Sequence, residues 1–109
     1  MPLYMTQFAY TPEAWAALVR QPEDRIGTTR ALLEQAGGRL HEYYYSWGDY
    51  DGVMIFEAPD ESVATAVLLA GISAGHLKAV KTTTLLPAEK ALAAMRAAGT
   101  LTLKPPGVS

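Results

Sequence analysis

The chain has 109 residues, half of them hydrophobic and 18% charged, and its 9 basic and 11 acidic residues give a formal net charge of −2. This composition is typical of one globular domain, and the lack of any run of like charge argues against a nucleic-acid partner and against a membrane surface as partner. Because the chain has no cysteine, disulfides, thiolate catalysis and cysteine-rich metal sites are excluded.

Neither secretion nor membrane insertion is indicated by the sequence. Residues 1–10 lack the basic, apolar and small-residue regions of a secretory signal. The longest apolar stretch without a charge, Val63–Gly75, is shorter than the roughly 20 residues that a membrane-spanning helix requires. We therefore expect a cytoplasmic protein.

The first third of the chain is predicted to form a strand followed by a helix in two pieces. Leu3–Tyr10 is rich in strand-forming residues,. Thr11 is a good helix cap, and Pro12 suits the first position of a helix. Pro22 interrupts this helix, and a second helical piece is expected over Glu23–Ala36.

Two strands, a helix and a further strand are predicted next. Arg39–Trp47 is an aromatic strand, Gly48–Gly52 is a dense turn signal, and Val53–Phe56 pairs with the first of these strands as a hairpin,. Asp60 caps a helix whose apolar stripe is wide, which indicates that the helix is well buried. Leu77–Leu86 is the fourth strand.

The order β-α-β-β-α-β predicts an α+β fold, the ferredoxin-like sandwich, in which two helices cover one face of a four-stranded antiparallel sheet. An extra C-terminal helix is expected from Pro87 to Ala98, and Gly99 ends it. We therefore assign residues 1–99 to a single domain and residues 100–109 to a C-terminal tail. Leu101 and Leu103 in this tail either fray or add a short strand to a neighbouring sheet.

The predicted middle strands are apolar on both faces, which indicates an oligomer. Val53–Phe56 does not alternate between apolar and polar residues as a half-exposed strand does,. Tyr44 points to one face, whereas Tyr43 and Tyr45 point to the other. Since two helices cover only one face, we expect the other to meet a second copy of the chain, sheet against sheet. The alternative is that the C-terminal helix folds back over it.

Several segments at characteristic spacing resemble the GYD-domain family. The segment Gly48-Asp49-Tyr50-Asp51 is followed by an apolar strand and then by Glu57-Ala58-Pro59-Asp60. Upstream, Gly37-Gly38-Arg39-Leu40 and Tyr45-Ser46-Trp47 fit the same pattern, and the resemblance covers about residues 3–90. It implies a ferredoxin-like fold similar to the dimeric α/β-barrel proteins. It implies no catalytic residue, because no general activity belongs to the family.

The aromatic strand and its turn are the candidate ligand site. On strand parity, His41, Tyr43, Tyr45 and Trp47 share one face, and Tyr50 follows in the turn. Histidine is an acid or base near neutral pH, and tyrosines orient polar ligands while their rings form pocket walls. The alternative is that these rings only build the sheet face and the interface.

Other polar residues are assigned to ordinary structural positions. Asp49 and Asp51 are interpreted as turn residues and His76 as an exposed loop residue. Arg25, near a helix start, is interpreted as a solvated or salt-bridged surface arginine, and the alternative is that it binds an anion. With two histidines and no cysteine, no metal site is predicted, and no motif indicates a cofactor.

Two functions remain open from the sequence. The first is an oligomeric module, with itself as partner, that binds a small, partly apolar ligand in a pocket at the sheet face or serves only as a scaffold. The alternative is a cofactor-independent enzyme, a monooxygenase or an isomerase, because such reactions occur among the dimeric α/β-barrel proteins that the family resembles.

Overall fold

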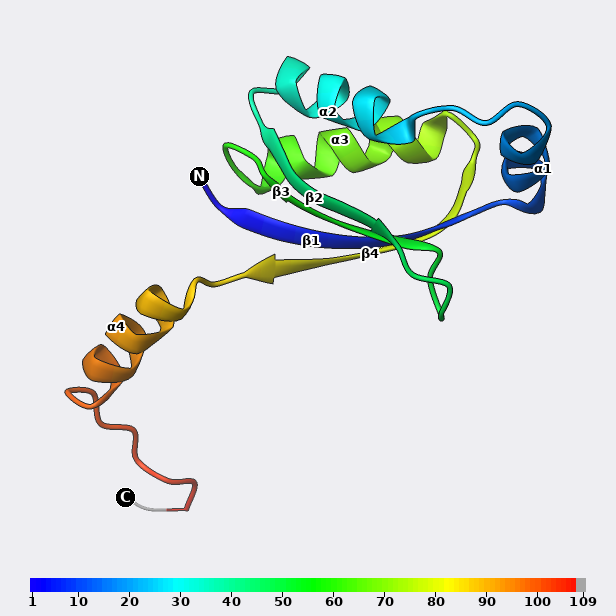
Figure 1. Ribbon diagram of the computed structural model, residues 1–109. Coiled ribbons are helices and arrows are strands. Elements are labelled where there is room, and N and C mark those ends of the chain that lie inside the picture. Colours follow the sequence, from blue (N-terminus) through cyan, green and yellow to red (C-terminus); the bar gives the residue numbers. More distant parts are fainter. Residues whose placement is uncertain (108–109) are drawn as a thin grey trace.

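A four-stranded antiparallel sheet organises the computed structural model, which describes residues 1–107 (Figure 1). The strands lie in the order β2-β3-β1-β4. The elements are β1 (Leu3–Tyr10), α1 (Pro12–Arg20), α2 (Arg25–Gln35), β2 (Arg39–Tyr45), β3 (Gly52–Glu57), α3 (Glu61–Ser73), β4 (Leu77–Leu85) and α4 (Ala88–Ala98). This α+β arrangement confirms the predicted ferredoxin-like sandwich. Residues 108 and 109 of the predicted tail lie outside the described residues.

Side-chain caps fix where the helices begin. The Thr11 hydroxyl accepts a hydrogen bond from the Ala14 N–H, and Asp60 accepts one from the Val63 N–H, as the sequence predicts,. Asp24 accepts from the first turn of α2. The helix therefore begins at Arg25, two residues after the predicted start, because a capping residue itself lies outside the helix.

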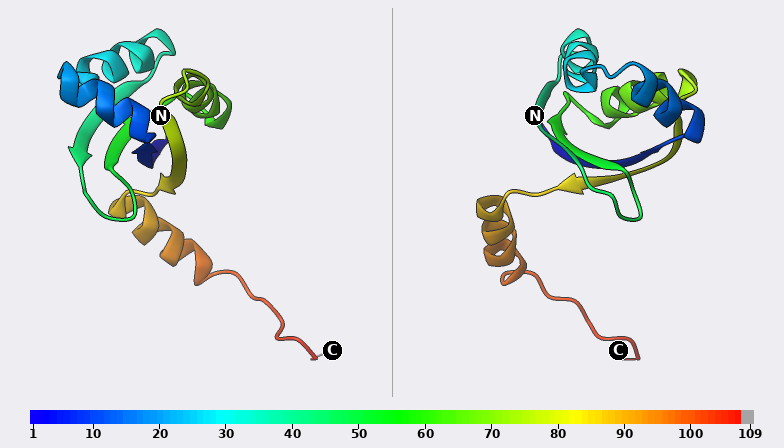
Figure 2. Two further views of the ribbon diagram at one scale, coloured as in Figure 1. Left: turned by 90° about the vertical axis from the view of Figure 1, so that its right-hand side faces the viewer. Right: turned by 45° about the vertical axis from the view of Figure 1, so that its right-hand side comes forward.

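The core lies between the sheet and the two helices α2 and α3, which cover the same face (Figures 1 and 2). Phe56 and Leu33 are completely buried there, and the ring of Tyr4 stacks on Phe56 with centroids 5.4 Å apart. The alternation of β1 and β3 supplies this face, because successive side chains of a strand point to opposite sides. The core cluster consists of Tyr4, Leu33, Leu40, Met54, Phe56, Ala58, Ala64 and Val67.

The other face of the sheet has no helix over it. Met5, Val53 and Ile55 are half-buried on this open face, and Tyr44 is 58% exposed. Helix α4 extends away from the sheet instead of folding back over it, and the described residues span 65 Å in their longest direction (Figures 1 and 2). A patch of apolar side chains on the open face is therefore uncovered within one copy of the chain, next to the polar side chains of Gln7, Glu42 and Lys81.

Within residues 1–107, no helix combines the length and the apolarity that crossing a bilayer demands.

Candidate ligand pocket

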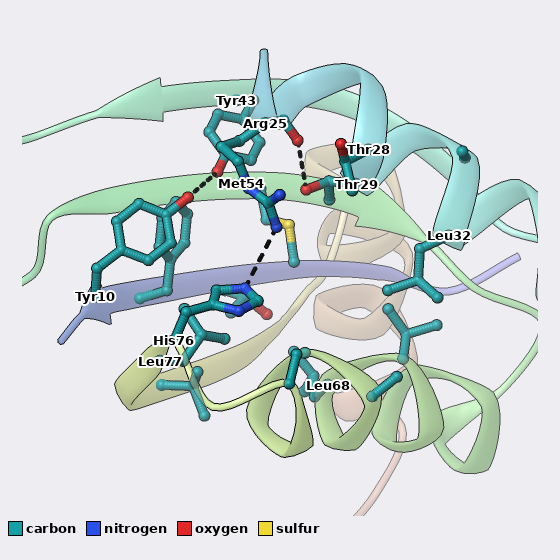
Figure 3. A pocket seen from close by; sticks show the side chains of 18 of the residues that line it. Tyr10, Arg25, Thr28, Thr29, Leu32, Tyr43, Met54, Leu68, His76 and Leu77 are labelled. Atoms are coloured by element: carbon teal, nitrogen blue, oxygen red, sulfur yellow. Dashed lines mark hydrogen bonds between the residues drawn. The ribbon is translucent and has the colours of Figure 1, made fainter. Parts of the chain in front are cut away.

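A pocket of about 410 Å³ lies between the helix-covered face of the sheet and the helices α2 and α3 (Figure 3). Most of its lining is apolar. The sheet contributes Phe8, Met54 and Val80, α2 contributes Leu32, and α3 contributes Val67 and Leu68. A pocket of this size with an apolar lining is typical of small-molecule sites. It lies on the helix-covered face of the sheet, whereas the sequence predicts that two subunits share the other face.

Small side chains on the two helices leave this space unfilled. Thr28, Thr29 and Ala31 of α2 line the pocket, as do Ala70 and Gly71 of α3. Farther along the sheet, the large side chains of the core occupy the space between the sheet and the helices and pack closely there,. The pocket is therefore a consequence of side-chain size in the sequence of the two helices.

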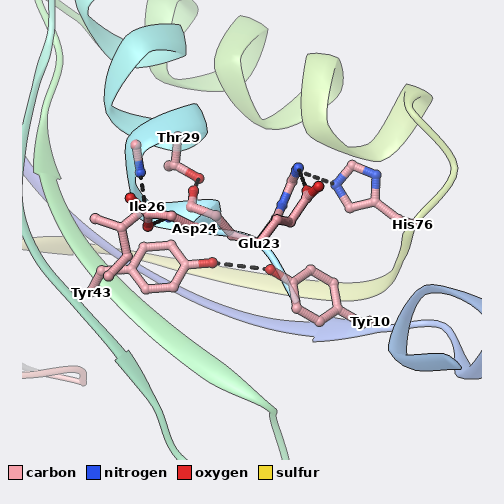
Figure 4. A network of polar contacts seen from close by, with 9 residues as sticks. Tyr10, Glu23, Asp24, Ile26, Thr29, Tyr43 and His76 are labelled. Atoms are coloured by element: carbon pink, nitrogen blue, oxygen red, sulfur yellow. Dashed lines mark hydrogen bonds and ion pairs between the residues drawn. The ribbon is translucent and has the colours of Figure 1, made fainter. Parts of the chain in front are cut away.

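Two pairs of polar side chains meet at one end of the pocket (Figures 3 and 4). The hydroxyl oxygens of Tyr10 and Tyr43 are 3.1 Å apart and share a hydrogen bond. Nη2 of Arg25 lies 3.4 Å from Nε2 of His76, and Nη1 of Arg25 donates to Glu23 over 2.7 Å. The pocket therefore has an apolar body and one polar end.

The protonation states at this end follow from burial and charge. Burial and the hydrogen bond to Tyr10 raise the pKa of Tyr43 well above its ordinary value, so this hydroxyl keeps its proton. Burial and the positive charge of Arg25 lower the pKa of His76, so its imidazole is neutral at pH 7,. Because a guanidinium only donates, Nε2 of His76 is the acceptor and its ring proton is on Nδ1.

A cluster of aromatic side chains extends outward from the tyrosine pair. Tyr45 packs edge-on against Tyr43, with ring centroids 5.8 Å apart, and stacks on Trp47 at 6.1 Å. Trp15 of α1 packs against both Trp47 and Tyr10 at 5.1 Å. Burial raises the pKa of Tyr45 to about 12. This outer aromatic cluster borders the pocket without lining it.

Asp51 holds the outer aromatic cluster in place. One of its carboxylate oxygens accepts hydrogen bonds from the Tyr10 backbone N–H and from Nε1 of Trp15, both over 2.9 Å. The Asp51 N–H in turn donates to the carbonyl of Phe8. Asp51 therefore joins the turn after β2 to β1 and α1, whereas Asp49 is an exposed turn residue as predicted.

The structure brings only part of the predicted site together. Tyr43 lines the pocket, and Tyr45 and Trp47 belong to the outer aromatic cluster. Tyr50 is half-buried in the turn and lines neither of the two pockets described. Trp47 lies beyond the end of β2 at Tyr45 and has a φ of 50°, so strand alternation does not determine its direction. Its ring lies beside the predicted site because it stacks on Tyr45.

The expectation that His41 shares a face with Tyr43 is wrong. The pairing of β2 with β3 shifts register between Leu40 and Glu42, so His41 is an extra residue in the strand. Such a bulge reverses which face each of the following residues of the strand points to. His41 lies 3.0 Å from Glu57, whose neighbour Phe56 points into the core, so His41 is on the open face.

Three residues at the polar end lie outside the predicted ligand site. The sequence places Tyr10 only in a strand. The interpretation of His76 as an exposed loop residue is wrong, since His76 is half-buried and lines the pocket, and Arg25 is salt-bridged as interpreted but also half-buried in the pocket wall. Arg25 and His76 are 51 residues apart. No sequence pattern connects them, because each follows an ordinary loop.

Within residues 1–107, no three histidine, aspartate or glutamate side chains gather into a group that holds a metal ion. The carboxylate of Asp51 is already an acceptor for two N–H groups of the protein. The polar end of the pocket consists of an arginine, a histidine and two tyrosine hydroxyls, which suits hydrogen bonding to an organic ligand better than metal coordination.

Two solved structures share the fold. MtbAldR is 15% identical, with a TM-score of 0.54 over 79% of this chain and 52% of that chain, so the chain spans about half of its length. TTHA0845 from Thermus thermophilus is 16% identical, with a TM-score of 0.52 over 81% of this chain and 96% of that chain. No curated protein is similar enough to count as a relative.

The family resemblance seen in the sequence is supported over most of the chain. The model of the GYD domain matches residues 4–95, from the first strand to the last helix. The matched region includes the turn that carries Asp51, the tyrosines of β2 and every residue of the polar end. The chain therefore belongs to the GYD-domain family.

Proposed function

We propose that this GYD-domain protein is an oligomer that binds a small, partly apolar ligand in the pocket between the sheet and the helices α2 and α3. The observation that carries the proposal is the pocket of about 410 Å³, which combines apolar walls with polar groups at a single end. Apolar walls supply affinity by burying the ligand, and a few convergent polar groups supply orientation.

Gly71 offers a test that separates binding from folding. It lines the pocket from α3, and a Cβ added there would lie 3.4 Å from Cδ1 of Leu77, an ordinary contact. Gly71→Ala is expected to raise the free energy of unfolding by about 0.5–1 kcal/mol, since glycine disfavours a helix. Gly71→Leu keeps this gain but adds a side chain that occupies the pocket.

The probe is N-phenyl-1-naphthylamine, a neutral apolar fluorophore whose emission increases in an apolar site. We expect the wild type and Gly71→Ala to bind it and Gly71→Leu to bind it at least about tenfold more weakly, with no loss of melting temperature. Equal binding by the two variants would mean that the fluorophore lies elsewhere, and absence of binding to the wild type would remove the support for a ligand function.

The oligomeric part of the proposal is supported by the open face of the sheet. Met5, Val53 and Ile55 are half-buried there with no helix above them, and a second copy that covers them removes apolar area from water. The exposed Leu92 and Met95 on α4 add apolar surface away from the sheet. We expect light scattering after size exclusion to give at least twice the mass of one chain.

Ile55→Lys is expected to dissociate this assembly, because removing a charge from water in the proposed interface costs more than an ion pair with its cross-strand neighbour Glu42 returns,. The matched control is Leu69→Lys on α3, where the leucine is 58% exposed and away from the open face. A wild type that elutes as a single chain, or a control that dissociates equally, would contradict the proposed interface.

A cofactor-independent enzyme, a monooxygenase or an isomerase, is the second candidate function. It is favoured by one observation, the neutral imidazole of His76 beside the tyrosine hydroxyls in the pocket wall. A neutral imidazole accepts a proton, and a hydroxyl donates to a developing oxyanion. An isomerase exchanges an acidic C–H proton of a bound carbonyl compound with deuterated water, which NMR detects, whereas a binding module leaves it unchanged.

A further inference from the structure

The charge in the pocket is of one sign. Among the lining residues of the described chain, Arg25 alone carries a permanent charge, and none is an aspartate or glutamate. The other titratable groups that face this end are His76, Tyr10 and Tyr43. His76 is neutral and the hydroxyl of Tyr43 stays protonated, for the reasons of burial given above. A ligand at this end therefore meets one positive charge and no negative charge from the wall.

Arg25 is held at the pocket without being neutralised inside it. Its side chain is 21% exposed, and its only carboxylate partner within residues 1–107 is Glu23, whose side chain is 54% exposed and does not line this pocket. An ion pair with an exposed carboxylate contributes little. A guanidinium has five N–H donors, and the described contacts use one for Glu23 and one, over a long 3.4 Å, for His76.

The tyrosine pair supplies a further donor. Tyr10 and Tyr43 share one hydrogen bond, which uses one of their two hydroxyl protons, so the pair still offers a proton to an acceptor. The same end borders a second, smaller pocket of about 270 Å³, which shares Tyr10, Arg25 and His76 with the first and opens beside α1. Arg25 and the tyrosine pair therefore still have free donors at this end, whereas the carboxylate of Glu23 lines only the second pocket.

The rest of the pocket lining has no charged side chain, and its polar members are three threonines and Gln35. Leu32, Met54, Val67, Leu68 and Leu77 form its body, together with small helical side chains. From this distribution we propose that the ligand is an amphipathic acid. Its apolar body lies between α2 and α3, and its single anionic group, such as a carboxylate, lies against the Arg25 guanidinium and the tyrosine hydroxyls. This inference rests on the proposed function of the pocket.

The experiment compares molecules that differ only at the head group. The probes are 3-phenylpropionate and its neutral amide, 3-phenylpropionamide, measured by isothermal titration calorimetry at low salt. We expect the acid to bind at least about tenfold more tightly, which is about 1.4 kcal/mol, since a hydrogen bond between two charged groups is stronger than one to a neutral amide. Equal binding of acid and amide would overturn the inference.

Arg25→Met removes the charge but keeps most of the length of the side chain. We expect it to reduce binding of the acid by about tenfold or more and binding of the amide by a much smaller factor, so that the preference for the acid is lost. Arg30→Met is the matched control, because Arg30 is exposed on the same helix and lines neither of the two pockets described. If both variants lose the acid equally, a general loss of positive charge explains the effect and the assignment to Arg25 is wrong.

The neutral fluorophore separates this inference from the proposed function. If N-phenyl-1-naphthylamine binds and Gly71→Leu excludes it, the pocket is a ligand site whatever its head-group preference. If the fluorophore binds but the protein binds the acid no more tightly than the amide, or does not bind the acid, the inference is wrong and the proposed function stands. If neither the fluorophore nor the acid binds, the proposed function and this inference fail together.

Discussion

Replacing Phe56 with alanine is expected to lower the free energy of unfolding by about 3–5 kcal/mol, the usual cost of emptying a large aromatic site in a core. Phe56 is 0% exposed and stacks on Tyr4, so its removal leaves a cavity in the core near the end of β3 and also exposes a face of the tyrosine ring. Since domains of this size have about 5–15 kcal/mol in total, the variant is expected to be close to unfolding at 37 °C.

Urea denaturation followed by circular dichroism measures this loss. Leu69→Ala is the control, since Leu69 is 58% exposed on α3 and exposed substitutions usually stay within about 0.5 kcal/mol. Similar losses for both variants would mean that the sheet and helices do not enclose the core described here.

The second large effect is expected at Asp51. In Asp51→Ala, the Tyr10 N–H and Nε1 of Trp15 both lose their acceptor. An unsatisfied buried donor costs about 1–3 kcal/mol, so we expect a loss of about 2–4 kcal/mol in the free energy of unfolding. Asp51→Asn keeps an oxygen acceptor without the charge and is expected to lose less.

Tryptophan fluorescence reports this change, because Trp15 detaches from the outer aromatic cluster when its hydrogen bond is lost. The chain has two tryptophans, so Trp47→Phe is made in each background to isolate the Trp15 signal. Asp49→Ala is the control: Asp49 is exposed in the same turn and its removal is expected to change stability by less than about 0.5 kcal/mol. An Asp51→Ala variant as stable as the control would show that the two hydrogen bonds contribute nothing.

The importance of Asp51 was not predictable from the turn alone. Asp is common in turns because its side chain bonds the local backbone, and that is how the sequence pattern was interpreted. In the structure, the groups that donate to the Asp51 carboxylate belong instead to residues 41 and 36 positions away. The same residue type in the same turn thus has a tertiary role that the local pattern does not reveal.

The sequence by itself determined the order of the elements, the helix caps at Thr11 and Asp60, the family and the apolar character of both sheet faces. These properties are local: a capping side chain reaches three residues, and the parity of a strand follows from its own alternation. For that reason the opposite directions of Tyr43 and Tyr44 were predicted correctly.

Only the tertiary structure decided which side chains form the pocket. A single bulge in β2 moved His41 to the open face, and helix packing brought Arg25 and His76 together across 51 residues of chain. The direction of α4 was likewise left open by the sequence (Figure 1). Periodicity specifies which way a residue faces within its own element, whereas a pocket depends on the register and side-chain size of several elements at once, and no local pattern contains that information.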